Sequence, residues 1–489
     1  MLFRSAATTP AAGNSQGLEL LLLPDPTVRD GRFNNNGWMQ ELPKPLTKLT
    51  WDNAALMSQA TAEKLGLAPS VGGLTVADEK VVEFALGEHK LKVPVLVLPG
   101  HPDDAVTIHL GYGRTHVGKI GMGTGFNGYL LCTTAAPYFM VGVKAAATGE
   151  TYPLSHTRSH HSMEGRDILM EDTLDVFLKK NDFAQTEATK NPEIAVDDHQ
   201  ATASDNGEGK QLSLYDAKDH EYKSDENAYA YSWGLSIDNN VCIGCNACVT
   251  ACQNENNIPI VGKDQVQRGR EMHWIRIDRY YRGPISNPHT FFTPVTCMHC
   301  ENAPCEPVCP VAATVHSKEG MNQMVYNRCV GTRYCSNNCP YKVRRFNFYK
   351  YTAGQPDPDK LSGNNDSLVL QLLSNPEVTV RGRGVMEKCS YCVQRVNTAR
   401  QTAKKEGRAI KDGEVVTACQ QSCPTQAIVF GDIADKTTLV SKLKALPTNY
   451  MMLGELNTRP RTTYLARLRN PNPAITADVE NGPDTPVVE

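Results

Sequence analysis

The sequence has no long hydrophobic run. Its longest apolar stretches, such as Leu20–Leu23 and Val93–Leu98, are far shorter than the roughly 20 residues that a membrane helix needs, so we predict no membrane span. The first residues, Met-Leu-Phe-Arg-Ser, lack both the pattern of an export signal and a twin-arginine start. We expect either that the protein stays where it is made or that the start at Met1 is truncated.

The chain also has no large excess of charge of either sign. The 489 residues hold 50 Lys and Arg against 53 Asp and Glu, a net charge of −3. This balance gives no basic surface for nucleic acid, so we expect no nucleic-acid partner. The chain contains no Cys-x-x-Cys-His sequence, which excludes a c-type haem of its own. Its length allows about three domains or fewer, with ample room for a buried core.

Cysteine is the residue in which the chain is rich. It has 16, of which all but Cys132 lie between Cys242 and Cys423. A disulfide framework is typical of small secreted domains, and the fifteen clustered cysteines are an odd number. Repeated spacings also distinguish them from scattered buried cysteines. We interpret Cys132 as an ordinary buried cysteine of that kind. Metal or cluster ligation is the remaining interpretation.

The fifteen cysteines form four runs, each ending in Cys-x3-Cys. The runs are Cys242-x2-Cys245-x2-Cys248-x3-Cys252, Cys297-x2-Cys300-x4-Cys305-x3-Cys309, Cys329-x5-Cys335-x3-Cys339 and Cys389-x2-Cys392-x26-Cys419-x3-Cys423. Proline follows the last cysteine in three of them. This is the ferredoxin pattern, in which three thiolates converge on one cluster and the last cysteine ligates the cluster of the paired run. Zinc ribbons also use Cys-x2-Cys pairs, but zinc does not explain triplets followed by x3-Cys-Pro.

The third run departs from the pattern. In register, Thr332 stands where the second cysteine belongs. A neutral hydroxyl is a poor iron ligand compared with a thiolate, so we expect a 3Fe–4S cluster there and three 4Fe–4S clusters elsewhere. That assignment uses all fifteen thiolates. The alternative is a fourth iron held by water or by the Thr332 oxygen.

The rest of the chain gives a coarse organisation. Residues 17–145 alternate apolar runs with turns and read as mainly β, with a hairpin of Val81–Leu86 and Lys90–Leu98. We predict helices over Asp52–Leu65, Asp167–Lys180 and Thr438–Leu446. Residues 182–228 are polar and read as a linker. The tail from Asn470 is expected to be disordered or to wrap a partner.

The third run resembles the iron–sulfur subunit of bacterial alternative complex III, a quinol oxidase module. The resemblance rests on Tyr326-Asn-Arg-Cys329-Val-Gly-Thr332-Arg-Tyr-Cys335 and on Cys339-Pro-Tyr-Lys-Val-Arg-Arg-Phe-Asn-Phe348. Earlier segments are similar to the double-psi barrel of molybdopterin oxidoreductases. They are Thr50-Trp51-Asp52-Asn53, Pro94-x4-Pro99-Gly100, Leu110-Gly111-Tyr112-Gly113-Arg114 and Gly121-x-Gly123-x-Gly125.

This resemblance implies an α+β protein with a double-psi β-barrel domain and a four-cluster ferredoxin-like domain. The expected divisions are a barrel at 1–155, a helix and polar linker at 156–228, the cluster domain at 229–440 and a tail at 441–489. The family's pairing also implies four ligand groups. Group 1 is Cys242, Cys245, Cys248 and Cys423; group 2 is Cys252, Cys389, Cys392 and Cys419; group 3 is Cys297, Cys300, Cys305 and Cys339; group 4 is Cys309, Cys329 and Cys335.

The function implied is electron transfer rather than catalysis, and we single out no catalytic residue. The expected partners are a multispan membrane subunit that binds quinol and multihaem cytochrome c subunits, on the periplasmic face of the cytoplasmic membrane. One alternative is the electron-transfer part of a molybdenum oxidoreductase of the polysulfide or nitrate reductase type. Another is a scaffold whose clusters are only structural.

Several other residues have competing interpretations. We interpret Gly121–Gly125 as a barrel turn rather than a nucleotide loop, because no βαβ unit surrounds it. His156, His160 and His161 favour a surface turn over a metal site. Asn53 is where the family contacts a pterin, but most of that cradle is missing, so a molybdenum cofactor is not expected. Four basic residues beside group 4 could tune its potential, meet a partner or face solvent, and we predict that they form the quinol-side docking face. They are Lys342, Arg344, Arg345 and Lys350.

Overall fold

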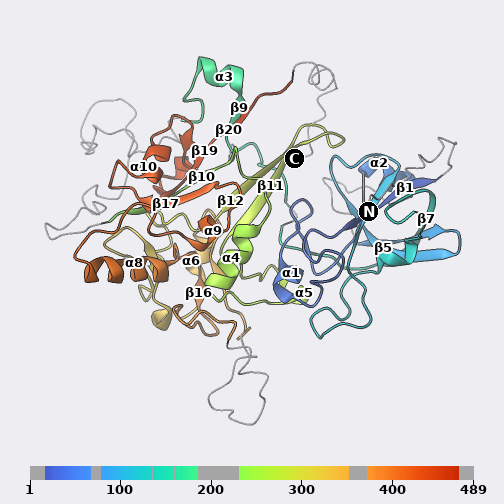
Figure 1. The fold of residues 1–489 in the computed structure, drawn as a ribbon, viewed down its shortest axis with the longest axis horizontal. Helices are drawn as coiled ribbons and strands as arrows, with labels where there is room; N and C mark the ends of the chain where they lie inside the picture. Colours follow the sequence, from blue (N-terminus) through green and yellow to red (C-terminus); the bar gives the residue numbers. More distant parts are fainter. Residues whose placement is uncertain are drawn as a thin grey trace, which may run out of the picture. The chain divides into compact units, whose positions relative to one another are not determined.

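The computed structural model describes residues 17–67, 79–134, 136–158, 160–166, 168–185, 231–351 and 372–472. By its internal contacts the chain forms two compact units. The first is mainly residues 1–159 with 282–289, and the second is mainly 160–281 with 290–483. Each is described by itself below, and Figure 1 labels their elements.

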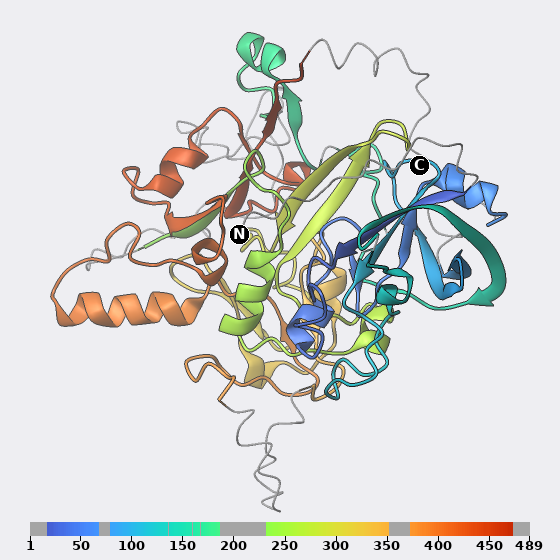
Figure 2. The ribbon, with the colours of Figure 1, turned by 45° about the vertical axis from the view of Figure 1, so that its right-hand side comes forward.

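The first unit is built on a closed β-barrel with the strand order β1-β6-β3-β5-β4-β7. Its strands are β1 (Leu18–Pro24), β3 (Ala55–Met57), β4 (Lys80–Leu86), β5 (His89–Val97), β6 (Ala105–Leu110) and β7 (Phe139–Thr151). The pairs β1–β6 and β3–β5 are parallel, while the other pairs are antiparallel. Figure 2 shows β7 as a long curved strand. The shorter elements are α1 (Gly37–Glu41), β2 (Leu49–Thr50), α2 (Gln59–Lys64), η1 (Gly128–Leu131) and β8 (Ser155–His156).

The barrel closes around alternating apolar residues of its strands. Leu20 and Leu22 on β1 and Val106 and Ile108 on β6 are fully buried in one hydrophobic cluster. Because successive side chains of a strand point to opposite faces, this period-two pattern places one face of each strand inside. The interior is therefore filled by side chains.

Predictions for this unit were partly right. The hairpin is confirmed, since β4 and β5 pair antiparallel across Gly87 and Glu88. A helix beginning at Asp52 is wrong, because residues 55–57 pair with β5 and β6 as strand β3. The helix α2 begins only at Gln59, where the Ser58 side chain accepts a hydrogen bond from the Thr61 N–H. The segment Gly121–Gly125 lies in turns between β6 and β7.

The second unit contains a four-stranded sheet with the order β17-β10-β19-β18. These strands are β10 (Trp233–Asp238), β17 (Ile428–Asp432), β18 (Asn449–Tyr450) and β19 (Thr462–Leu465). The central strand β10 pairs antiparallel with β17 and parallel with β19. Its Leu235 and Ile237 are buried, and they line the cavity of group 2 described below. The sheet thus forms one wall of the cysteine-bearing region.

Short elements surround this sheet. The helices are α3 (Leu174–Lys179), α4 (Ala247–Glu255), α5 (Lys263–Gln267), η3 (Tyr326–Arg328), α6 (Tyr334–Asn337), α8 (Val393–Lys405), α9 (Ala418–Gln421), α10 (Leu439–Lys444) and η4 (Gly454–Leu456). The remaining strands form the pairs β9 (Glu171–Thr173) with β20 (Arg467–Arg469), β11 (Arg276–Arg282) with β12 (His289–Val295), β13 (Thr314–His316) with β14 (Asn322–Met324), and β15 (Arg345–Phe346) with β16 (Met386–Glu387).

Two helix predictions have opposite outcomes here. The helix near Thr438–Leu446 is confirmed as α10, with Thr438 as its N-cap. The helix over Asp167–Lys180 is wrong over most of its length: β9 pairs with β20, and only Leu174–Lys179 is helical. That pairing joins segments almost 300 residues apart, which no local pattern reveals. The linker at 182–228 and the tail from Asn470 lie largely outside the described residues.

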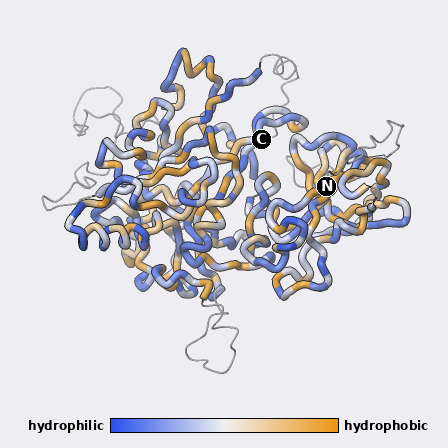
Figure 3. The backbone as a smooth tube through the Cα atoms, in the orientation of Figure 1, coloured by the Kyte–Doolittle hydropathy of each residue, from blue (hydrophilic) through white to orange (hydrophobic). Residues whose placement is uncertain are grey.

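The long spacer before Cys419 carries α8, as expected for a helix-bearing excursion. This helix is largely hydrophilic, as Figure 3 shows. Among the described residues, every helix falls short of the length and hydrophobicity of a bilayer-spanning helix.

Candidate metal centres

The cysteine loops share a local conformation where they enter a helix. Asn246, which follows Cys245, is left-handed with a φ of 63° and precedes α4. Arg333, which follows Thr332, is left-handed with the same φ and precedes α6. These two positions are equivalent only if Thr332 is aligned with Cys245. The backbone therefore supports the register in which Thr332 occupies a ligand position.

The structure brings the cysteines into four neighbourhoods. Burial raises the pKa of each central thiol, and neighbouring cysteines raise it further. For Cys248 these neighbours include Cys242, Cys245 and Cys423; for Cys252 they are Cys389, Cys392 and Cys419; for Cys300 they are Cys297, Cys305 and Cys339; for Cys335 they include Cys329 and Cys309. Apart from Cys419, which has the largest of the cysteine effects on Cys248, these neighbours are the residues expected in each of groups 1 to 4. Cys419 also acts on Cys248, so groups 1 and 2 adjoin each other.

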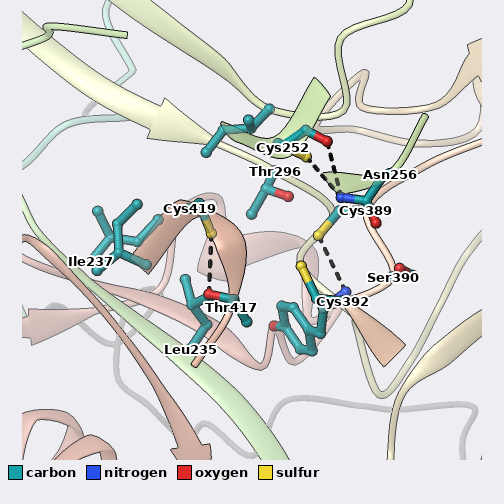
Figure 4. A pocket seen from close by; sticks show the side chains of 13 residues that line it. Leu235, Ile237, Cys252, Asn256, Thr296, Cys389, Ser390, Cys392, Thr417 and Cys419 are labelled. Carbon is teal, nitrogen blue, oxygen red and sulfur yellow. Dashed lines mark hydrogen bonds between the residues drawn. The ribbon is translucent and has the colours of Figure 1, made fainter. Parts of the chain in front are cut away.

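Group 2 encloses a small cavity. Its four cysteines line the cavity together with apolar side chains such as Ile237 and Ile275. Figure 4 shows their sulfur atoms around the space that Thr417 and Asn256 also border. The helices α4 and α9, which carry Cys252 and Cys419, pack against each other. The order of the elements thus assembles one site from segments more than 160 residues apart.

Group 4 lines a second cavity. Its three cysteines are joined there by Gly331, Thr332 and Arg333. The Thr332 side chain is exposed, and it stands in register with Cys245 of the first run. The site therefore has three thiols and one hydroxyl, and one side of it is open to solvent.

Hydrogen bonds to sulfur recur across the groups. The Ala313 N–H donates to Cys309 Sγ at 3.2 Å, and the Ala427 N–H donates to Cys423 Sγ at 3.2 Å. In both cases the donor lies four residues after a cysteine that proline follows, so the same turn is used twice. Such bonds favour the thiolate, which is the form that ligates metal. These backbone N–H groups can therefore stabilise the negative charge that the sulfurs carry as cluster ligands.

The donor set fits iron–sulfur clusters better than single ions. All sixteen cysteines are free thiols. In the described ranges, no three Cys, His, Asp or Glu side chains converge closely enough to share one metal ion. A structural zinc ion needs four ligands within about 2.3 Å of one centre. Several thiols around one cavity, as at groups 2 and 4, are the ligands that iron–sulfur clusters use.

The basic residues beside group 4 do not form a docking face together. Arg344 is buried, and its guanidinium donates to Cys305 Sγ at 2.9 Å. Arg345 forms a largely buried ion pair with Glu271 at 2.7 Å. Lys342 and Lys350 are exposed. The prediction of a four-residue basic docking surface is therefore wrong, because two members are used inside the protein.

Sequence reasoning missed polar residues inside the cysteine region. Lys388, directly before Cys389, is 2% exposed and donates to the Asn322 and Cys389 carbonyls. His299, between Cys297 and Cys300, is fully buried. A charged or aromatic residue inside a ligand loop is the only signal that could have indicated them.

Residues with competing interpretations have ordinary surroundings. Asn53 is buried and donates to the His109 and Phe126 carbonyls at 2.6 and 2.9 Å. His160 contacts Glu164 at 2.9 Å, while His156 lies 3.4 Å from the Thr47 carbonyl oxygen. Cys132 is half-buried rather than buried, and it donates to the Pro137 carbonyl.

Comparison with known proteins gives matches in the same region. Two families described as 4Fe–4S dicluster domains match residues 241–313 and 288–355. The iron–sulfur cluster-binding subunit of menaquinone reductase from Nitratidesulfovibrio vulgaris is 37% identical over 244 residues, which are 49% of this chain and 90% of that protein. A putative dimethyl sulfoxide reductase iron–sulfur subunit from Halobacterium salinarum is 34% identical, over 48% of this chain and 79% of that protein. The Hdr-like menaquinol oxidoreductase iron–sulfur subunit 1 from Archaeoglobus fulgidus is 30% identical, over 47% and 82%.

Proposed function

This protein belongs to the family of 4Fe–4S iron–sulfur subunits that includes those of menaquinone and dimethyl sulfoxide reductases, and we propose that it conducts single electrons from quinol through four clusters. It is an electron-transfer subunit with ferredoxin-like 4Fe–4S domains. Its matched relatives account for about half of its sequence. The barrel lies outside residues 241–313 and 288–355, which the two dicluster families match.

One observation carries the proposal. The four groups of thiols lie in one unit, and adjoining groups hold cysteines near enough to act on one another, Cys419 on Cys248 and Cys297 on Cys389. Clusters supply one-electron redox chemistry, with potentials set by cluster type, charge and hydrogen bonds. The protein's own part is to hold the thiolates, to donate hydrogen bonds to them and to exclude water around groups 2 and 3.

We propose 4Fe–4S clusters at groups 1, 2 and 3 and a 3Fe–4S cluster at group 4. The supporting observation is Thr332, which lines the group 4 cavity at the position equivalent to Cys245. Iron analysis of anaerobically prepared protein should give about 15 iron atoms per chain, and the oxidised protein should show the paramagnetic signal of a three-iron cluster. A count of about 16 without that signal would show that Thr332 or water holds a fourth iron.

Partners and location extend the proposal. The relatives include a polysulfide reductase component from Wolinella succinogenes and a menaquinol oxidoreductase subunit. We place the protein at the membrane, next to a multispan quinol-binding subunit, with multihaem cytochrome c subunits as acceptors. The best arrangement is that of alternative complex III, on the periplasmic face. The barrel's closed six-stranded order with two parallel pairs supports a double-psi barrel. We propose that the barrel takes no part in the redox chemistry.

A second candidate is the electron-transfer part of a molybdenum oxidoreductase. The names of the dimethyl sulfoxide and polysulfide reductase relatives favour it. Metal analysis of the native complex separates the two candidates. Molybdenum or tungsten near one atom per complex would favour the second, and covalently bound haem without either metal would favour the first.

A redox titration followed by electron paramagnetic resonance tests electron transfer itself. We expect four reversible one-electron transitions in the native protein. A protein whose clusters are structural would keep full iron content but show no reversible transitions at potentials that quinols reach. That result would overturn the proposed function while leaving the cluster assignment intact.

A further inference from the structure

Arg344 is a buried cation among the cluster ligands. It follows the third run by five residues, and only 5% of the residue is exposed. Its Nη2 donates to Cys305 Sγ at 2.9 Å and to Asn322 Oδ1 at 3.0 Å. Its Nη1 donates to Thr314 Oγ1 at 3.1 Å and lies 3.1 Å from Met324 Sδ.

These contacts include no carboxylate. Three of the four partners are neutral, and the fourth is a cysteine. A buried charge without a counterion is unfavourable, and an arginine stays protonated under all ordinary conditions. Among the described residues, the compensating negative charge therefore comes from the Cys305 thiolate and from the cluster that Cys305 would ligate. The positive charge of the guanidinium is balanced only when group 3 ligates its cluster.

Arg344 also reaches the next group. Its partners Thr314 and Met324 both line the cavity that contains Cys309, Cys329 and Cys335. Burial raises the pKa of the Cys335 thiol, and the nearby positive charge of Arg344 lowers it. One guanidinium thus stands between the thiolates of groups 3 and 4.

We propose that Arg344 is a positioning residue that raises and couples the reduction potentials of the clusters at groups 3 and 4. The inference rests on the proposed electron-transfer function. When either cluster accepts one electron from a donor, no bond forms or breaks, and its negative charge rises by one. A fixed buried cation stabilises that added charge more than the oxidised state, so both clusters become easier to reduce. Once one cluster is reduced, its added negative charge offsets part of the effect of the cation, so the reduction potential of the other cluster falls.

The neighbouring Arg345 provides a matched control. It is also an arginine of low exposure, but its charge is paired with Glu271 at 2.7 Å. The test compares Arg344→Gln, Arg344→Lys and Arg345→Gln in the full chain, by potentiometric titration with dithionite and electron paramagnetic resonance. Iron content is measured for each variant. The three-iron signal reports on group 4, and the reduced four-iron signals report on the others.

In Arg344→Gln we expect the three-iron potential and one of three four-iron potentials to become more negative. Each shift should reach at least a tenfold change in the one-electron equilibrium constant, which is about 59 mV. The other two four-iron potentials should stay in place, because groups 1 and 2 have no contact with this guanidinium among the described residues. Arg344→Lys should show smaller shifts, since it keeps the charge and loses the fork. Arg345→Gln should shift none.

Some outcomes would overturn the inference. Unchanged potentials in Arg344→Gln at full iron content would do so, as would equal shifts in Arg345→Gln. If Arg344→Gln loses iron, the result for Arg344→Lys decides. Full iron content with potentials close to native in Arg344→Lys would support the role of the charge. Full iron content with fully shifted potentials would contradict the inference, and iron loss in both variants would also contradict it. Absence of reversible transitions in the native protein would instead refute the proposed function.

Discussion

The imidazole ring of His299 stacks on the ring of Tyr391, with centroids 3.7 Å apart and planes inclined by 22°. His299 lies between two cysteines of group 3, and Tyr391 lies between two cysteines of group 2. Both rings are fully buried. Burial lowers the pKa of His299 well below its ordinary value, which favours the neutral ring. The two central ligand loops therefore touch directly.

This stack should hold both loops in place. We predict that Tyr391→Leu speeds the loss of clusters in air by roughly two- to tenfold, because an aromatic pair contributes about 0.5–1.5 kcal/mol. Tyr391→Phe is the matched control, since it keeps the stack and removes only the hydrogen-bonding contact of Tyr391 Oη with Thr462 Oγ1. The measurement is the decay of visible absorbance together with iron release. Equally accelerated cluster loss in both variants would show that the hydroxyl, not the ring, holds the loops in place.

The vacant ligand position gives a second prediction. Thr332→Cys should convert the group 4 cluster from three irons to four and lower its reduction potential, because the new thiolate anchors the corner iron and adds negative charge. Thr332→Ser should keep the three-iron signal. Iron analysis and electron paramagnetic resonance check both variants. Persistence of the three-iron signal in Thr332→Cys would mean that the register is wrong, although Asn246 and Arg333 share a left-handed φ of 63°.

The sequence allowed prediction of the features that depend on local spacing. The β4–β5 hairpin and helix α10 follow from turn and cap residues, and the family of cluster subunits follows from the cysteine runs. The failures all depend on partners far along the chain. Strand β3 lies where a helix was expected because its neighbours β5 and β6 supply the hydrogen bonds. The burial of Arg344 depends on Cys305 and Asn322, which no charge pattern around residue 344 indicates.

Acid sensitivity should follow in part from His273. This residue is 4% exposed, and burial, with the nearby Arg345 charge, lowers its pKa to about 3. The unfolded polypeptide takes up a proton near pH ~6.5 while the folded protein does not, so stability is lost as the pH falls below about 6.5. At pH ~5.5 the expected loss is about 1.4 kcal/mol relative to neutral pH. It should continue to grow towards the folded pKa of about 3.

The test compares urea midpoints of the native protein and His273→Phe at about pH 7.5 and about pH 5.5, with visible absorbance as the signal. Other groups also titrate in this range, so the informative quantity is the difference between the two proteins. We expect the variant to lose less stability than the native protein on acidification. An identical loss would show that His273 is not protonated on unfolding, or that it titrates normally in the folded state.

Lys342 and Lys350 are the two exposed members of the basic run that follows the third run of cysteines. If this surface meets the membrane partner, replacing both by Glu should slow quinol-dependent reduction several-fold, up to roughly tenfold at low salt, because charge complementarity acts mainly on association rates. Reduction by dithionite should stay normal, since the Lys342 side chain bonds to the Asn337 carbonyl rather than to a cysteine sulfur. The matched control is Lys404→Glu with Lys405→Glu, which makes the same charge change in the last turn of α8. The defect should shrink as salt screens the charges. Equal slowing in the control pair would indicate a general effect of net charge, and unchanged reduction in both pairs would place electron entry at another surface.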